Sequence, residues 1–297
     1  MALIDGLLSP GSTFQKRFFF LAKRFVAGES IDAALTAVRQ LNAQGMSATL
    51  DFLGEDVKKN YEALHTRDVY LQMLDRIGDS GLQTNVSVKL TALGLLIGES
   101  IASDNLATIL ARAQHNSDPF VRIDMEGSAI TQATLRVFEK LYGQYRNVGP
   151  VLQAYLKRTP GDIDRAIALG ARVRLCKGAY NEPREVAYKD MPTIRRQFSR
   201  SAERLLLANH YPGIATHDPI LVQAVKRFTE RKQIAKDAFE FQLLYGVRPE
   251  MQRALVSQGY RVRVYIPFGT HWATYFYRRV TERRENALFA FRSMLQK

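Results

Sequence analysis

Residues 120–126 read FVRIDME, a run that begins with apolar side chains and ends with carboxylates. Valine and isoleucine favour extended chain, and the alternation along the run places Arg122 and Asp124 on the same face of a strand. In parallel α/β proteins the functional site lies at the carboxyl ends of the strands, where such polar endings belong. The run therefore predicts a strand of a parallel sheet that carries charged groups towards a site.

The chain contains seven further runs of this kind, separated by longer segments with helical character. Spacings of roughly 20 to 40 residues fit a strand, a helix and two loops, which is the repeating unit of parallel α/β proteins. Eight units predict a (β/α)8 TIM-like barrel, with an open doubly wound sheet as the alternative. We assign residues 1–45 to an N-terminal helical extension and 46–297 to the catalytic barrel, within one structural domain overall. The predicted strands are 48–53, 85–90, 120–125, 151–156, 173–177, 213–216, 240–244 and 261–266.

The bulk composition bounds the partners of the protein. Lys and Arg number 42 against 29 Asp and Glu, and this excess favours nucleic acid, anionic lipid or anionic small molecules. No RNP-like, zinc-finger or helix-turn-helix signature accompanies the charge, so nucleic acid is not expected. The single cysteine excludes an internal disulfide. The first residues lack a signal-peptide pattern and no run approaches a spanning helix, so we expect a cytoplasmic protein, with peripheral contact at the inner face of the cell membrane as a further hypothesis.

Charges of both signs are predicted to point into the barrel. Lys89, Arg122, Asp124 and Arg174 fall on strand faces that alternation places inside. Burying them is costly unless they pair with one another or with a ligand, and we expect an ion pair between Lys89 and Asp124. The interior is therefore interpreted as the binding site of a polar, partly charged molecule.

The last helix carries the most informative spacing. In HWATYFYRRVTERREN, Tyr275, Arg278, Arg279 and Glu282 lie at i, i+3, i+4 and i+7, on one helical face. Two adjacent guanidinium groups can clamp a carboxylate through parallel hydrogen bonds, and Glu282 can orient or neutralise them. The alternative is a solvated face with an i,i+4 ion pair.

Other chemistries receive less support from the residues. Lys89 or Lys177 at a strand end could form a Schiff base. His217 and Asp218, with Asp124 and Glu126, could be imagined around a divalent ion, but no HxH or HExxH spacing supports this and no metal is expected. Cys176 is interpreted as a small core residue. Residues 13–28, TFQKRFFFLAKRFVAG, would either contact a membrane surface or pack on the barrel itself.

No GxGxxG or P-loop motif occurs, so a bound nucleotide would have to be held by strand-end side chains, loop amides and a helix N-terminus. Eight motifs, in order from about residue 49 to 286, resemble the bacterial monofunctional proline dehydrogenases and the matching domain of bifunctional proline utilisation flavoenzymes. They are SVKLTALG, VRIDMEGS, VLQAYLKR, VRLCKGAYNEP, ATHD, FEFQLLYG, RVYIPFG and YFYRRVTERREN.

The resemblance implies a (β/α)8 barrel with non-covalent FAD and a final helix over the active site. It implies oxidation of L-proline to Δ1-pyrroline-5-carboxylate by hydride transfer from ring C5 to flavin N5, the first step of proline catabolism to glutamate. A membrane quinone would reoxidise the flavin, which makes an anionic membrane surface a candidate partner, and a separate pyrroline-5-carboxylate dehydrogenase would receive the product.

The resemblance also implies roles for individual residues. Lys89, Arg278 and Arg279 would bind the proline carboxylate, with Glu282 ion-paired nearby and Asp124 holding the polar network beneath. Tyr265, Tyr275 and Leu244 would wall the proline pocket, and Gln153 and Arg174 would lie at the isoalloxazine. The remaining FAD contacts would be Asp124, Met125, Lys177, Gly178, Ala179, Thr216, His217, Gln242 and Tyr245.

Two departures and three alternatives accompany this interpretation. Many relatives read RLVKGAYW where this chain has Cys176 and Asn181, so the flavin edge there would differ. The short loop PFGTHWATYF argues against a fused second enzyme. The alternatives are a flavin-dependent barrel dehydrogenase for a related imino acid such as hydroxyproline, a Schiff-base lyase, and a basic binding protein without catalysis.

Overall fold

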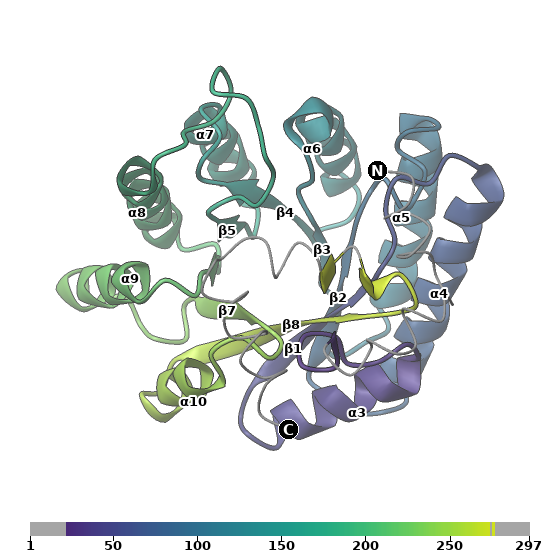
Figure 1. Cartoon of the computed structure of the whole chain (residues 1–297), viewed down its shortest axis with the longest axis horizontal. Coiled ribbons are helices and arrows are strands. Elements are labelled where there is room, and N and C mark those ends of the chain that lie inside the picture. Colours follow the sequence, from purple (N-terminus) through teal and green to yellow (C-terminus); the bar gives the residue numbers. More distant parts are fainter. Residues whose placement is uncertain (1–21, 274, 277–297) are drawn as a thin grey trace, which may run out of the picture.

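The computed structural model describes residues 22–273, 275 and 276. Within them eight parallel strands close into a barrel in sequence order, because β1 pairs with both β2 and β8 (Figure 1). This confirms the predicted (β/α)8 architecture and makes the open sheet wrong. The strands are β1 (Ser47–Phe52), β2 (Thr84–Val88), β3 (Val121–Ile123), β4 (Val148–Gln153), β5 (Arg174–Cys176), β6 (Gly213–Ala215), β7 (Glu240–Leu244) and β8 (Arg261–Phe268).

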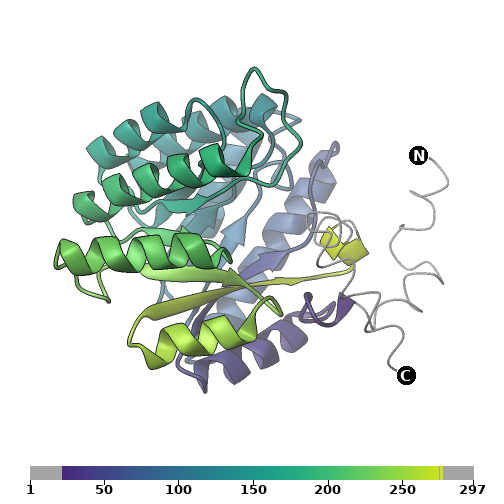
Figure 2. The same ribbon diagram turned by 60° about the vertical axis from the view of Figure 1, so that its left-hand side comes forward.

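Helices surround the strands as an outer ring (Figures 1 and 2). Their apolar faces pack on the outward-facing side chains of the strands, such as Leu50, Val86 and Ile123, which are fully buried. No helix of residues 22–273 is both long and apolar enough to cross a bilayer. The helices are α3 (Ile31–Asn42), α4 (Asn60–Gly78), α5 (Glu99–Ala113), α6 (Ser128–Tyr142), α7 (Thr159–Leu169), α8 (Met191–Ala208), α9 (Pro219–Arg231) and α10 (Pro249–Ser257).

The predicted strand positions agree with the structure most closely at β7 and least at β4. The sequence predicts 151–156, whereas β4 spans Val148–Gln153 and residues 154–156 enter a turn. Leu156 forms an isolated antiparallel bridge with Ala187 instead. Gly149 and Pro150, which normally weaken a strand, concealed the true start of β4.

The segment before β1 packs on the barrel where it is described. Ala22 and Val26 are buried in a small cluster with Leu53, Trp272 and Tyr275. The amide of Ala27 donates to the carbonyl of Pro267 at 3.0 Å, and the helix α3 lies against β1 and β8 (Figure 1). For residues 22–28 the structure therefore supports packing on the barrel itself; the rest of the 13–28 stretch lies outside the described residues.

Candidate active site

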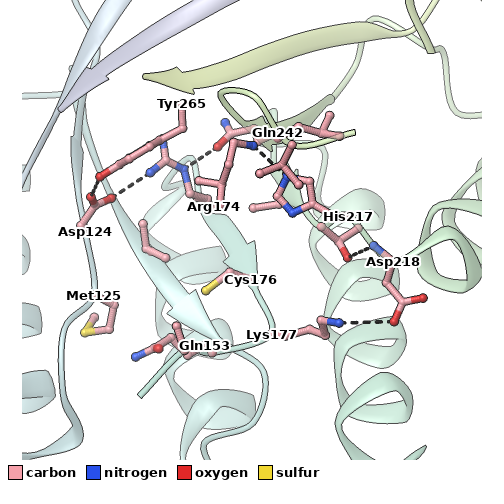
Figure 3. A pocket seen from close by; sticks show the side chains of 18 of the residues that line it. Asp124, Met125, Gln153, Arg174, Cys176, Lys177, His217, Asp218, Gln242 and Tyr265 are labelled. Atoms are coloured by element: carbon pink, nitrogen blue, oxygen red, sulfur yellow. Dashed lines mark hydrogen bonds and ion pairs between the residues drawn. The ribbon is translucent and has the colours of Figure 1, made fainter. Parts of the chain in front are cut away.

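A cavity of about 790 Å³ lies at the carboxyl ends of the strands. Its walls come from β2 to β8 and from the loops that follow them (Figure 3). Most of the residues that the resemblance implicates meet there. Those that line the cavity are Lys89, Asp124, Met125, Gln153, Arg174, Lys177, Gly178, Ala179, Thr216, His217, Gln242, Leu244, Tyr265 and Tyr275.

Asp124 stands at the centre of the polar floor. Its carboxylate accepts hydrogen bonds from the Ser87 hydroxyl at 2.6 Å and from the Tyr265 hydroxyl at 2.7 Å. The Arg174 guanidinium adds a charged contact of 2.8 Å, so three strands converge on one side chain (Figure 3). Burial and the neighbouring Asp124 carboxylate raise the pKa of Tyr265 well above its usual value, which keeps this phenol protonated and donating.

Arg174 is held from two sides. Its Nη1 donates to Asp124 and to Ser87, while its Nε donates to the side-chain carbonyl of Gln242 (Figure 3). Gln242 fits there because residue 213 is a glycine, and a Cβ at that position would overlap the Gln242 amide. The guanidinium also lies 5.3 Å from the ring centroid of Tyr265. A positive charge is thus fixed at the cavity wall in a defined orientation.

Lys89 has a second, closer partner beside the one predicted. Its ammonium group contacts both carboxylate oxygens of Asp51 at 2.7 Å, and it also forms the predicted ion pair with Asp124, at a longer distance of 4.0 Å. Asp51 escaped notice because it lies inside the apolar run of β1 rather than at its end. Burial alone would lower the pKa of Lys89, but Asp51 and Asp124 raise it above the usual value. A permanently protonated amine is a poor nucleophile, which weighs against the Schiff-base alternative.

Another part of the cavity wall carries further cations, of which Figure 3 labels Lys177. Asp218 caps the N-terminus of α9 and accepts contacts from Lys177 at 3.3 Å and Arg195 at 2.8 Å. Arg248, at the N-cap of α10, lines the same region. Arg195 and Arg248 could not be predicted from the sequence, because nothing in the local pattern shows that the starts of α8 and α10 converge on one cavity.

Several implicated residues have other placements. Tyr245 does not line the cavity; it is half-buried and packs against the barrel core. Cys176 packs against that core as expected, but it also lines the cavity. The ring of His217 accepts a hydrogen bond from the Leu244 amide at 2.8 Å, and residues 22–273 contain no cluster of three metal-ligating side chains. Arg278, Arg279 and Glu282 lie outside the described residues.

Arg122 lies inside the barrel but not in the cavity. It belongs to a lower layer, nearer the amino ends of the strands, where it donates to the carbonyls of Pro150 (3.0 Å) and Arg172. Below the cavity floor Arg263 pairs with Glu240 at 2.8 Å and with Asp118 at 3.1 Å. The expectation that Arg122 takes part in the binding site is therefore wrong, because alternation defines the face of a side chain but not its height in the barrel.

Comparisons with known proteins identify the family of this chain. A family described as proline dehydrogenase matches residues 34–292. Proline dehydrogenase 2 of Bacillus subtilis is 39% identical over 93% of this chain and 91% of its own, and proline dehydrogenase of Deinococcus radiodurans is 38% identical over 95% and 92%.

Larger proteins share the same domain. The bifunctional protein PutA of Escherichia coli is 28% identical over 92% of this chain, which spans 24% of PutA. The solved structure of proline utilization A from Bdellovibrio bacteriovorus, inactivated by N-propargylglycine, superposes with a TM-score of 0.82 at 27% identity; it covers 90% of this chain, which spans a third of that protein.

Proposed function

The chain belongs to the proline dehydrogenase family, and from this premise we propose that it oxidises L-proline to Δ1-pyrroline-5-carboxylate in the cavity above the barrel. The observation that carries the proposal is the network of Lys89, Asp124, Arg174 and Tyr265, which opens into that cavity. The family and the names of its curated relatives favour proline over hydroxyproline as the substrate.

Proline presents a carboxylate and a small apolar ring, and the cavity offers a group for each. Lys89 supplies a buried ammonium for the carboxylate, and the sequence adds the guanidinium pair of Arg278 and Arg279. Leu244 and Tyr275 supply apolar wall. Because Asp51 already neutralises Lys89, the carboxylate would share the ammonium with Asp51 rather than meet an isolated charge.

The cavity also fits FAD as a cofactor. Its volume lies in the usual range for cofactor sites, and one wall is backbone at Gly178, whose φ of 115° and contact with the Tyr155 ring exclude a side chain. Gln153 and Met125 would border the isoalloxazine, and Lys177, Arg195 and Arg248 offer cationic groups for the phosphates. When bound, FAD would take up the two electrons that proline loses.

The role of this chain is then to orient and to stabilise charge. Arg174, fixed by Asp124 and Gln242, would hold positive charge where negative charge grows during the reaction. Tyr265 would remain protonated, and its hydroxyl would hold the Asp124 carboxylate in place through their hydrogen bond. Fixing the substrate carboxylate at Lys89 would orient the ring for reaction.

We further propose a membrane quinone as electron acceptor, with a separate pyrroline-5-carboxylate dehydrogenase taking the product. The formal charge of +13 supports peripheral contact with an anionic membrane. Flotation with liposomes containing anionic lipid tests this contact. Binding at low salt that is lost at high salt is expected, and no flotation even at low salt would contradict it.

The visible spectrum tests the central proposal. Purified protein should show flavin absorption that bleaches when L-proline is added without oxygen. Flavin bands that do not bleach with proline would support FAD as the cofactor but contradict L-proline as the substrate. A colourless protein that cannot take up FAD would contradict both assignments.

A further inference from the structure

Glu126 is a buried carboxylate that the proposed reaction does not use. It lies three residues after β3, is 4% exposed and does not line the cavity. An ionised carboxylate in such a place requires partners, because an uncompensated buried charge is costly. Its partners are the hydroxyl and the backbone amide of Thr91, in the loop that follows β2.

These contacts continue into the loop between β1 and α4. Oε2 of Glu126 accepts from the Thr91 hydroxyl at 2.5 Å, and Oε1 accepts from the Thr91 amide at 3.2 Å. The Thr91 hydroxyl in turn accepts from the amide of Asp56 at 3.1 Å, and the Thr91 carbonyl accepts from the amide of Val57 at 3.2 Å. Asp56 has a φ of 58°, a left-handed conformation that is uncommon for residues other than glycine, although aspartate adopts it more readily than most.

Glu126 also contacts a residue that lines the cavity. Its backbone carbonyl accepts from the side-chain amide of Gln153 at 3.0 Å, and Gln153 lines the region where FAD would lie. One residue thus connects the loop beside Asp51 and Lys89 with a side chain on the flavin side.

Both contacts with Thr91 depend on the charge of Glu126. When Glu126 is ionised, one carboxylate oxygen accepts from the Thr91 hydroxyl and the other accepts from the Thr91 amide. A protonated Glu126, or a glutamine, has a donor in place of one of these acceptors, so in this arrangement it can accept from only one of the two Thr91 groups. The charged groups that face Glu126 are Lys89, directly after β2, and Glu55 from the β1–α4 loop. Glu182, from the β5–α8 loop, lies beside Gly127 and accepts from the amide of Ser128.

We propose that Glu126 is a positioning residue, which through Thr91 fixes the β1–α4 loop beside the substrate end of the cavity. The expected change in KM rests on the proposed oxidation of proline. The expected effect on the β1–α4 loop does not depend on that reaction. Burial raises the pKa of Glu126 to about 7, against the hydrogen bonds from Thr91, so the positioning weakens as the pH falls through neutrality.

The test compares Thr91→Val with Thr91→Ser in the FAD-loaded enzyme. Valine keeps the shape but removes the hydroxyl, whereas serine keeps it. We expect Thr91→Val to raise hydrogen exchange in the segment 53–59 and to raise KM for proline about fivefold, with kcat within about twofold of wild type. Thr91→Ser should behave as wild type in both measurements.

Glu126→Gln supplies a readout that stability alone would not change. In the wild type KM for proline should rise as the pH falls from 8 to 6, and in Glu126→Gln it should be high throughout with a flatter profile. Unchanged exchange and KM in Thr91→Val, or a lower melting temperature with unaltered kinetics, would overturn the proposal. If the wild type does not oxidise proline, the proposed function fails, and hydrogen exchange in the segment 53–59 still decides whether Glu126 positions the loop.

Discussion

The inside of the barrel has two layers of buried charged residues with nearly the same chemistry. The lower layer is enclosed by protein, whereas the upper layer borders the cavity. In the lower layer Arg263 contacts Glu240, Asp118 and the carbonyl of Ala48, so its donors are occupied by protein. In the upper layer Arg174 contacts Asp124 and Gln242 and also borders the cavity. Each layer sets an arginine against carboxylates and carbonyl groups, and Gln242 connects the two layers because it also donates to Glu240; only the upper layer borders the cavity.

The difference teaches that buried charge in a barrel does not by itself mark a site. A closed network of ion pairs specifies packing, and its members are costly to break singly. The same kinds of group can bind a ligand where the network borders a cavity. The two layers therefore predict opposite consequences for stability and for catalysis.

The largest effect is expected in the lower layer. Arg263→Met leaves Glu240 and Asp118 without their cation, and it should lower the free energy of unfolding by about 3–5 kcal/mol in chemical denaturation. The folded fraction should oxidise proline with normal KM. Arg261→Met is the matched control on the same strand: its pair with Asp237 is exposed and long, at 3.9 Å, so a change below about 1 kcal/mol is expected. A large loss of stability in the control would contradict the assignment.

The upper layer should respond in catalysis. Arg174→Met removes an oriented charge from the cavity wall, and kcat for proline should fall at least about 100-fold. Stability should change less than in Arg263→Met, because Asp124 keeps Ser87 and Tyr265. Arg165→Met, on the exposed face of α7, controls for the loss of an arginine. Near-normal turnover in Arg174→Met would show that Arg174, like Arg263, has only a structural role.

Two buried glutamates sharpen the comparison through pH. Burial raises the pKa of Glu126 to about 7, whereas in the lower layer Arg263 outweighs burial and lowers the pKa of Glu240. A raised pKa contributes stability below the ordinary value near 4.5, and this contribution is lost as the pH rises through about 7. Relative to wild type, Glu126→Gln should therefore gain up to about 3 kcal/mol between pH 4.5 and 8.

Glu240→Gln should show the opposite dependence in the same titration. The lowered pKa of Glu240 means that its stabilisation is complete above the ordinary value and is lost as the pH falls through the lower one. Its deficit relative to wild type should be full at neutral pH and shrink in acid. Parallel profiles for the two variants would show that the two buried carboxylates do not differ electrostatically.

The smallest effect is expected from single hydroxyl groups. Tyr265→Phe keeps the ring but loses the 2.7 Å hydrogen bond to Asp124, and kcat/KM for proline should fall about tenfold. Tyr211→Phe is the lower-layer counterpart, since its hydroxyl lies 3.3 Å from Glu240. The kinetics of Tyr211→Phe should match the wild type. Equal losses of kcat/KM in both variants would contradict the assignment of catalysis to the upper layer alone.

Much of this arrangement could be predicted from the sequence. The alternation of apolar and charged residues in FVRIDME located β3 and the inward direction of Asp124, and eight such runs gave the barrel. Polar strand endings identified Lys89, Lys177 and His217 as cavity residues. These signals are local, so they can be read from a few neighbouring residues.

The missed features are those that depend on distant parts of the chain. Asp51 becomes the partner of Lys89 only when β1 and β2 pair, 38 residues apart. Arg195 and Arg248 reach the cavity because the helices α8 and α10 begin at the same rim. The separate heights of Arg122 and Arg174 follow from the stagger of closed strands, which no single strand reveals.

A crystal structure of the FAD-loaded protein with a five-membered-ring carboxylate that cannot be oxidised would test the central claim most directly. The account predicts the isoalloxazine in the cavity beside Arg174 and Gln153, and the carboxylate within hydrogen-bond distance of Lys89, with the lower layer unchanged. Flavin bound elsewhere, or a carboxylate that avoids Lys89, would contradict the assignment of the upper layer as the active site.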